Sequence, residues 1–404
     1  MERLTGRMGL SLGVYVTALM LLAPGASIAG EAASGAPPRA LAADAAALAV
    51  AAAQDEPAEP EAPAEEPAEG GGAAEWFRQI AISGLVDSYY QFAFSEEPPA
   101  LRSFDVNHNS FTLSQAKLAL EKPVSDTSRA GFRVDFHIGD TADVVNSFEP
   151  GSEDLKFVEQ AYVSYLVPAG KGLKFDFGKF VTPHGGEVIE AASNYNYSRG
   201  ILFGFAIPFY HMGARFAYPV SDQVTLTGYV VNGWNNVLDN NGGKTLGVTL
   251  GYSPGGSYSF VGSYMVGPEG DDNSDDFRHL FDGLFSYTVS DATTVYANFD
   301  YGHDDVDAGA DWYGVATALR HQLNDTWAVA PRYEIFKDDD GWATGQAQTV
   351  QSITVTAEHK ISDFITRIEW RSDFSDEPFF ADGDALKKNQ SALIIAFIYT
   401  FASN

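Results

Sequence analysis

The sequence predicts an all-β fold: a transmembrane, antiparallel, up-and-down β-barrel of about 16 strands that follows a disordered N-terminal segment. Three observations predict it. From residue 80 onward, segments alternate between apolar and polar residues with the period of a strand. These segments run for about 10–13 residues, whereas globular strands average about 5–6 residues. The connections between them alternate strictly between short and long.

The segment 293–301 illustrates the alternation. One face consists of Val295, Ala297, Phe299 and Tyr301. The opposite face consists of Thr294, Tyr296, Asn298 and Asp300. An Arg or Lys on the lipid face of a membrane strand costs about 2–4 kcal/mol near the bilayer midplane. The faces that carry charges must therefore point into a wet interior.

The connections set the strand number. The short connections are 123–128, 167–172, 219–222, 253–256, 289–291, 322–325 and 359–362. The long connections are 95–109, 138–155, 182–208, 233–243, 267–276, 302–311, 337–346 and 373–389. Seven short and eight long connections imply sixteen strands with both termini on the short-turn side. Outer-membrane barrels have this arrangement, with short periplasmic turns and long outer loops.

Two segments precede the barrel, which is expected to span 76–404. Residues 1–29 have the pattern of an export signal, with Arg3 and Arg7, an apolar run over 8–22 and small residues before the cleavage position. The alternative is a membrane anchor, for which this run is short. Residues 30–75 are almost entirely Ala, Glu, Pro and Gly, and a segment of this composition is expected to stay disordered. It serves either as a solvated spacer or as an acidic tether to a periplasmic partner.

The composition excludes several classes of protein. With no cysteine, the chain can form neither a disulfide framework nor a cysteine-ligated metal site. A net charge of −29 argues against nucleic acid as a partner.

Much of the acid lies in the long connections, which predicts a hydrated anionic rim. Calcium binding is the alternative, but no acidic cluster matches an EF-hand, so no metal or other cofactor is expected.

The last segment supports the same fold. Its apolar positions are Leu393, Ile395, Phe397, Tyr399 and Phe401. This alternating series with an aromatic end resembles the C-terminal signature that the barrel-assembly machinery reads, although three further residues follow it here.

Several fragments together carry a family resemblance. They are 83–90, 111–120, 159–162, 177–180, 182–187 and 231–234. In this order, over about residues 80–401, the sequence resembles the OmpL-like β-barrel porin family and is more distantly similar to phosphate-selective porins. The resemblance implies a pore for small solutes that uses no cofactor.

The alternation and the resemblance together suggest the residues that line the pore. The candidates are Lys117, Arg133, Asp135, Arg215, Asp300, Arg320, Arg332, Glu334, Arg367, Glu369 and Arg371. They are either ordinary lumen residues paired across strands or, for the arginines, a track that attracts anions. The connection 182–208 is expected to fold into the lumen, and the residues expected to narrow it are Asn194, Tyr195, Asn196, Tyr197 and Arg199.

The sequence therefore predicts a porin of a Gram-negative outer membrane that passes small polar or charged solutes by diffusion. A substrate-selective channel for anions or small organic solutes is the alternative. A loop-displaying adhesion barrel and an outer-membrane hydrolase rank lower. The hydrolase is disfavoured because none of the eight histidines lies in a recognisable nucleophile motif. The expected partners are outer-membrane lipid and lipopolysaccharide, the assembly machinery, small solutes and, in a homotrimer, further copies of the chain.

Overall fold

The computed structural model describes residues 73–95, 97–147, 155–305 and 309–403. The predicted export signal and all but the last residues of the predicted linker lie outside them. Among the described residues, no helix is both long and apolar enough to cross a membrane.

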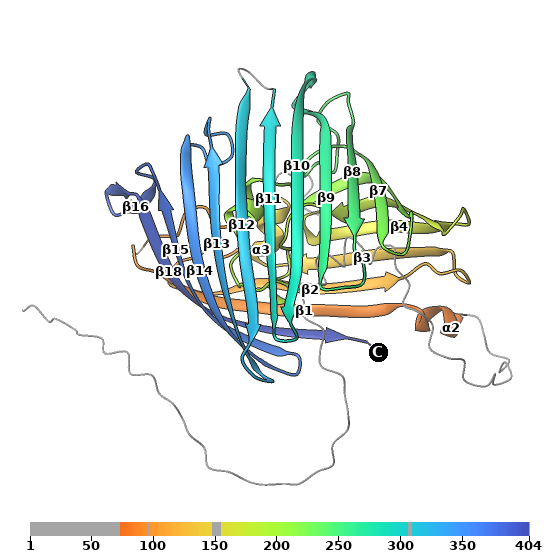
Figure 1. Ribbon diagram of the computed structural model, residues 1–404, viewed down its shortest axis with the longest axis horizontal. Helices are drawn as coiled ribbons and strands as arrows, with labels where there is room; N and C mark the ends of the chain where they lie inside the picture. The colour runs from red at the N-terminus through yellow and green to blue at the C-terminus, as the bar shows by residue number, and fades with distance from the viewer. Residues whose placement is uncertain (1–72, 96, 148–154, 306–308, 404) are drawn as a thin grey trace, which may run out of the picture. The chain divides into compact units, whose positions relative to one another are not determined.

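Sixteen antiparallel strands form one closed barrel, which confirms the predicted fold (Figure 1). The barrel strands are β1 (Ala81–Ala93), β2 (Ser110–Lys122), β3 (Ala130–Ile138), β4 (Val158–Val167), β5 (Leu173–Val181), β6 (Tyr210–Pro219), β7 (Val224–Val231), β8 (Thr245–Tyr252), β9 (Tyr258–Gly270), β10 (Asn273–Ser290), β11 (Thr293–Asp304), β12 (Ala310–Gln322), β13 (Trp327–Asp338), β14 (Gln348–Ile361), β15 (Phe364–Ser375) and β18 (Asn389–Ala402). Each pairs with its sequence neighbour, and β1 pairs with β18 from Ser83↔Ala402 to Ala93↔Ala392, so no strand edge stays open.

Short elements accompany the barrel. A helical segment, α2 (Ala73–Arg78), precedes β1, and the hairpin of β16 (Phe380–Asp382) and β17 (Ala385–Lys387) lies in the last long connection. The remaining elements are α3 (Asp140–Val145), η1 (Leu155–Phe157), η2 (Ala191–Ser193) and α4 (Ile201–Phe205).

The strands place their two faces as the alternation predicts. In β11, Phe299 and Tyr301 are exposed on the outer surface, whereas Asn298 and Asp300 are buried inside. In β18, Leu393, Phe397 and the other apolar positions of the predicted series point outward. The outer surface thus consists largely of apolar and aromatic side chains, as lipid contact requires.

One predicted detail of the barrel was wrong. Segment 267–276 was expected to be a long loop, but β9 continues to Gly270, β10 begins at Asn273, and only residues 271 and 272 connect them. Polar residues do not stop a strand whose backbone groups are paired with a neighbour. Phe336 on β13 points inward and is fully buried. It shares the inward face with Arg332 and Glu334, two and four residues earlier.

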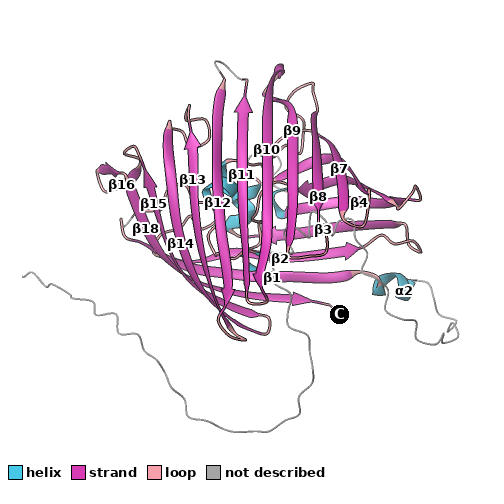
Figure 2. Ribbon diagram, viewed as in Figure 1, coloured by secondary structure: helices cyan, strands magenta, loops and turns pink. Residues whose placement is uncertain are grey.

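Long connections enter the interior of the barrel. Parts of three long connections are buried within it: 101–105, residues of α3, and most of 182–209. Figure 2 shows the helical turns behind strands β11 and β12. Phe104 of the first long connection and Leu202 and Phe203 of α4 belong to one apolar cluster with the inward-facing wall residues Trp312 and Phe336. A contact of this kind removes apolar surface from water on both sides, which favours the inserted position of the loops.

Candidate functional site: the inner loop and the wall around it

The connection between β5 and β6, residues 182–209, is here called the inner loop. Its two ends meet where the Thr182 amide donates to the Phe209 carbonyl at 2.9 Å. Gly185 adopts a φ of 92°, which glycine tolerates without steric cost. A Cβ on Gly200 would lie 2.0 Å from Glu334 Oε1, so a larger residue here would require the Glu334 side chain to move. Backbone conformation therefore brings the loop into the lumen.

Arg367 on β15 holds the centre of the loop. Its guanidinium donates to the carbonyl oxygens of Ala191 (2.6 Å), Asn194 (2.6 Å) and Asn196 (3.0 Å). The same side chain pairs with Glu358 on β14 at 2.7 Å. Because Arg367 is buried, these acceptors replace its water shell. A residue predicted to line the pore thus serves as the main anchor of the inner loop.

The next two inward positions of β15 bind the segment that follows. Glu369 accepts hydrogen bonds from the amides of Tyr197 (2.6 Å) and Ser198 (3.0 Å). Arg371 donates to the Arg199 carbonyl at 2.7 Å. Acceptor and donor alternate along one strand in the order that the loop backbone requires, so β15 fixes the loop register.

Strand β13 adds a third anchor. Arg332 donates to Glu187 at 2.5 Å and to the Ser198 carbonyl at 2.7 Å. Its neighbour Glu334 lies 3.2 Å from the same guanidinium. Burial raises the pKa of Glu187 on the inner loop, and the nearby Arg332 acts in the opposite direction.

The next part of the wall, formed by β1 to β4 and joined to β15 through β18, touches the loop at fewer points. Lys117 on β2 pairs with Glu159 at 2.6 Å, with Asp135 at 2.9 Å and with Glu190 of the inner loop. Arg133 on β3 pairs with Asp135 at 2.9 Å. Lys117 thus pairs with three carboxylates.

All five residues predicted to narrow the pore are buried in the barrel. The Tyr195 hydroxyl donates to Thr294 at 2.7 Å, and Asn196 donates to the Ala330 carbonyl at 2.9 Å. The Tyr197 hydroxyl donates to Asp87 on β1 at 3.1 Å. Asn194 and Arg199 are directed to carbonyl groups of the loop itself. Tyr195, Asn196 and Tyr197 thus connect the inner loop to β11, β13 and β1.

The other predicted lining residues also point inward. Arg215 pairs with Asp176 at 2.6 Å, and Arg320 pairs with Glu358 at 2.7 Å. All seven basic residues predicted to line the pore therefore have a carboxylate partner. Asp300 faces Asp282 in the adjacent strand, and within the described chain neither has a basic partner within ion-pair distance.

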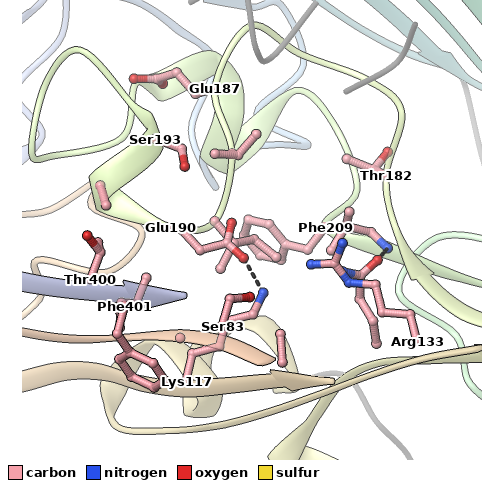
Figure 3. A pocket seen from close by; sticks show the side chains of 18 of the residues that line it. Ser83, Lys117, Arg133, Thr182, Glu187, Glu190, Ser193, Phe209, Thr400 and Phe401 are labelled. Atoms are coloured by element: carbon pink, nitrogen blue, oxygen red, sulfur yellow. Dashed lines mark hydrogen bonds and ion pairs between the residues drawn. The ribbon is translucent and has the colours of Figure 1, made fainter. Parts of the chain in front are cut away.

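A cavity of about 310 Å³ separates the inner loop from strands β1 to β5 and β18 (Figure 3). The loop side contributes residues including Val188, Ile189, Glu190, Ser193, Phe203 and Phe209. The wall side contributes residues including Ser83, Leu85, Lys117, Arg133, Gln160 and Thr400. Figure 3 shows Glu190 directed toward Lys117, the ion pair that crosses this space.

Several residues of this site were not among the predicted ones. Asp87 and Glu358 occupy inward positions of their strands, so the alternation contained the signal. Glu159 follows an irregularity in the β3–β4 pairing that shifts the phase of the alternation. Glu187 and Glu190 lie in a loop, where no periodicity marks the inward side. Within the described residues, no three His, Cys, Asp or Glu side chains are placed to hold a metal ion.

Solved structures share this architecture. The anion-selective porin from Comamonas acidovorans matches with a TM-score of 0.56 and 11% sequence identity, over 80% of this chain and 99% of that one. The trimer form of in-vitro folded OmpT from Vibrio cholerae has a TM-score of 0.54 and 13% identity, over 80% and 99% of the two chains. The outer membrane channel DcaP of Acinetobacter baumannii has values of 0.51 and 14%, over 80% and 97%. At these identities the similarity establishes the fold.

A family model extends the comparison. No curated protein sequence matches the chain. Residues 79–401, which include the whole barrel except the last residue of β18, match the model of the family described as "Putative beta-barrel porin-2, OmpL-like". Porins are outer-membrane channels and not enzymes. This chain is a member of that OmpL-like outer-membrane porin family.

Proposed function

We propose that this porin is a narrow diffusion channel that prefers cations and that the inner loop sets its bore. The observation that supports this most directly is the pairing of every predicted basic lining residue with a carboxylate, from Lys117 to Arg371. A paired guanidinium offers little net field to a passing anion.

Carboxylates dominate the remaining charge. Lys117 faces three of them, whereas Asp282 and Asp300 face each other across β10 and β11. Both oxygens of Asp300 lack a hydrogen-bond partner in the described residues. Rings of carboxylates favour cations in channels. The acidic outer connections add to this preference, because an anionic entrance raises the local concentration of cations.

An anion channel is the competing function. One structural neighbour is named an anion-selective porin, and this chain also carries inward arginines. Here, however, Arg332, Arg367 and Arg371 donate to loop carbonyls and pair with carboxylates, although Nη2 of Arg371 has no hydrogen-bond partner among the described residues.

The reversal potential of the refolded channel in a planar bilayer separates these functions. Under a KCl gradient we expect the sign that corresponds to preferred K⁺ passage. Replacing the unpaired acids, in the double variant D282N/D300N, is expected to reduce this preference. A reversal potential of the anion-selective sign in the unaltered protein would contradict the proposal.

The bore is tested separately. Deleting residues 194–199 removes the segment that Arg367, Glu369 and Arg371 hold inside the barrel. We expect single-channel conductance to rise, because this segment occupies cross-section of the lumen. Shortening the outer connection 339–347 by a similar length is the matched control. Unchanged conductance in the 194–199 deletion would contradict the constriction role.

Further features belong to the same proposal. We propose that residues 1–29 are removed during export and that the mature chain assembles as a trimer in contact with lipopolysaccharide. The trimer form recorded for OmpT supports the assembly. The mass of the protein purified from outer membranes tests the cleavage, and light scattering of the protein–detergent complex tests the trimer.

A further inference from the structure

The cavity beside the inner loop contains two different surfaces. Apolar side chains line one part of it, with Phe203 and Phe209 from the loop and Leu85 from β1. Charged groups line the other part. With a volume of about 310 Å³, the space accommodates a small organic molecule rather than a few waters alone.

The charged side chains that line the cavity differ in how many of their polar atoms are already bonded to other residues. The Arg133 side chain is 23% exposed, and each of its three nitrogens already donates to a carboxylate, to Asp135 at 2.9 Å or to Glu121 at 3.2 Å. The Glu190 side chain is 22% exposed, and Lys117 pairs with its Oε1. Among the described residues, no hydrogen bond reaches the second oxygen of Glu190. An accepting carboxylate oxygen therefore remains available beside the apolar surface.

The surrounding charge also favours a positive ligand. Lys117 is already shared by Asp135 and Glu159, and Arg133 is shared by Asp135 and Glu121. Glu190 adds a further negative charge to this group. An ammonium group would accordingly gain from the local field, whereas a carboxylate would meet a surplus of like charge. The hydroxyl of Ser193, on the same loop and lining the same cavity, can accept a second hydrogen bond.

We infer that this cavity is a binding site for small organic ammonium compounds with an apolar or aromatic body. The ammonium group binds Glu190, and the body packs against Phe203, Phe209 and Leu85. The inference rests on the proposed cation preference. It adds to that proposal the class of organic solute that binds inside the channel. A bound solute lies next to the ion pair that joins the loop to β2, so its residence also affects current through the pore.

Two matched probes test the site on the full-length refolded protein. Phenethylammonium and 3-phenylpropionate carry the same ring and spacer but opposite charge. By isothermal titration calorimetry we expect the amine to bind at least tenfold more tightly than the acid. E190Q is expected to weaken amine binding at least tenfold, whereas E377Q, on an exposed outer connection, changes it less than twofold. Heat-modifiable gel mobility verifies that each variant is folded.

The possible outcomes separate the two proposals. Equal binding of the two probes, no binding of the amine, or full binding by E190Q overturns the ammonium site. The comparison of the probes on the unaltered protein decides the matter even where E190Q does not fold. Reversal potentials of the same preparation report on the cation preference independently, so a selective channel that ignores phenethylammonium rejects the site alone.

Discussion

The inner loop meets two walls of the same barrel in different ways. Toward β13 to β15 it is held by charged side chains that bond mainly to its backbone, with Arg367 alone reaching three carbonyls. Toward β1 and β2 it is held by side-chain contacts, Tyr197 to Asp87 and Glu190 to Lys117, with a cavity beside them. Backbone anchoring fixes the path of a loop whatever its side chains are. Side-chain anchoring leaves room for solutes and depends on individual residues.

The largest effect is expected from breaking the backbone anchor. R367M removes three hydrogen bonds to the loop and one partner of Glu358. Loss of one member of a buried charged network costs about 3–5 kcal/mol. We expect a lower free energy of unfolding in denaturant titrations and a higher single-channel conductance. The control R129M removes an arginine from the partly exposed short-turn end. An unchanged conductance in R367M would show that the loop does not depend on β15.

Acid is expected to loosen the beginning of the loop, which the arginines do not hold. Burial, with a smaller effect of the nearby His211, lowers the pKa of His184 from 6.5 to about 3. Below about pH 6.5 a released loop binds a proton that the docked loop does not, so docking weakens as the pH falls toward 3. At pH 5 the free energy of loop docking is about 2 kcal/mol less favourable than at neutral pH.

Conductance at pH 7 and pH 5 measures this effect. The single-channel conductance of the unaltered protein is expected to be higher at pH 5 than at pH 7. The increase is expected to exceed the change in the conductivity of the bathing solution. H184L has no group to protonate at this position and is expected to lose that excess. An equal acid response in both proteins would assign it to other groups.

A smaller effect is expected on the side-chain-anchored wall. Y197F removes the hydroxyl that donates to buried Asp87 but keeps the ring, which lies 5.7 Å from that of Tyr89. One such hydrogen bond contributes about 1 kcal/mol. We expect a loss of that size in the free energy of unfolding, and less than about 0.5 kcal/mol for Y399F on the exposed outer face. Equal effects of the two variants would remove Tyr197 from the anchoring contacts.

Much of the barrel could be predicted because strand alternation is a local property. The inward position of Arg332 and Arg367 follows from the cost of a charge in lipid and needs no knowledge of their partners. The partners themselves could not be predicted. Arg367 and Asn194 are 173 positions apart, and no periodicity in the loop marks which carbonyls face inward.

The closing pair of strands determines when the pore acquires its final bore. The barrel is sealed by β1 and β18, the first and last strands to be synthesised. The inner loop emerges early in the chain, yet its strongest anchors are on β15, more than 170 positions later. Contacts that distant form late. We therefore expect an assembling barrel to pass through a wide stage before the loop docks.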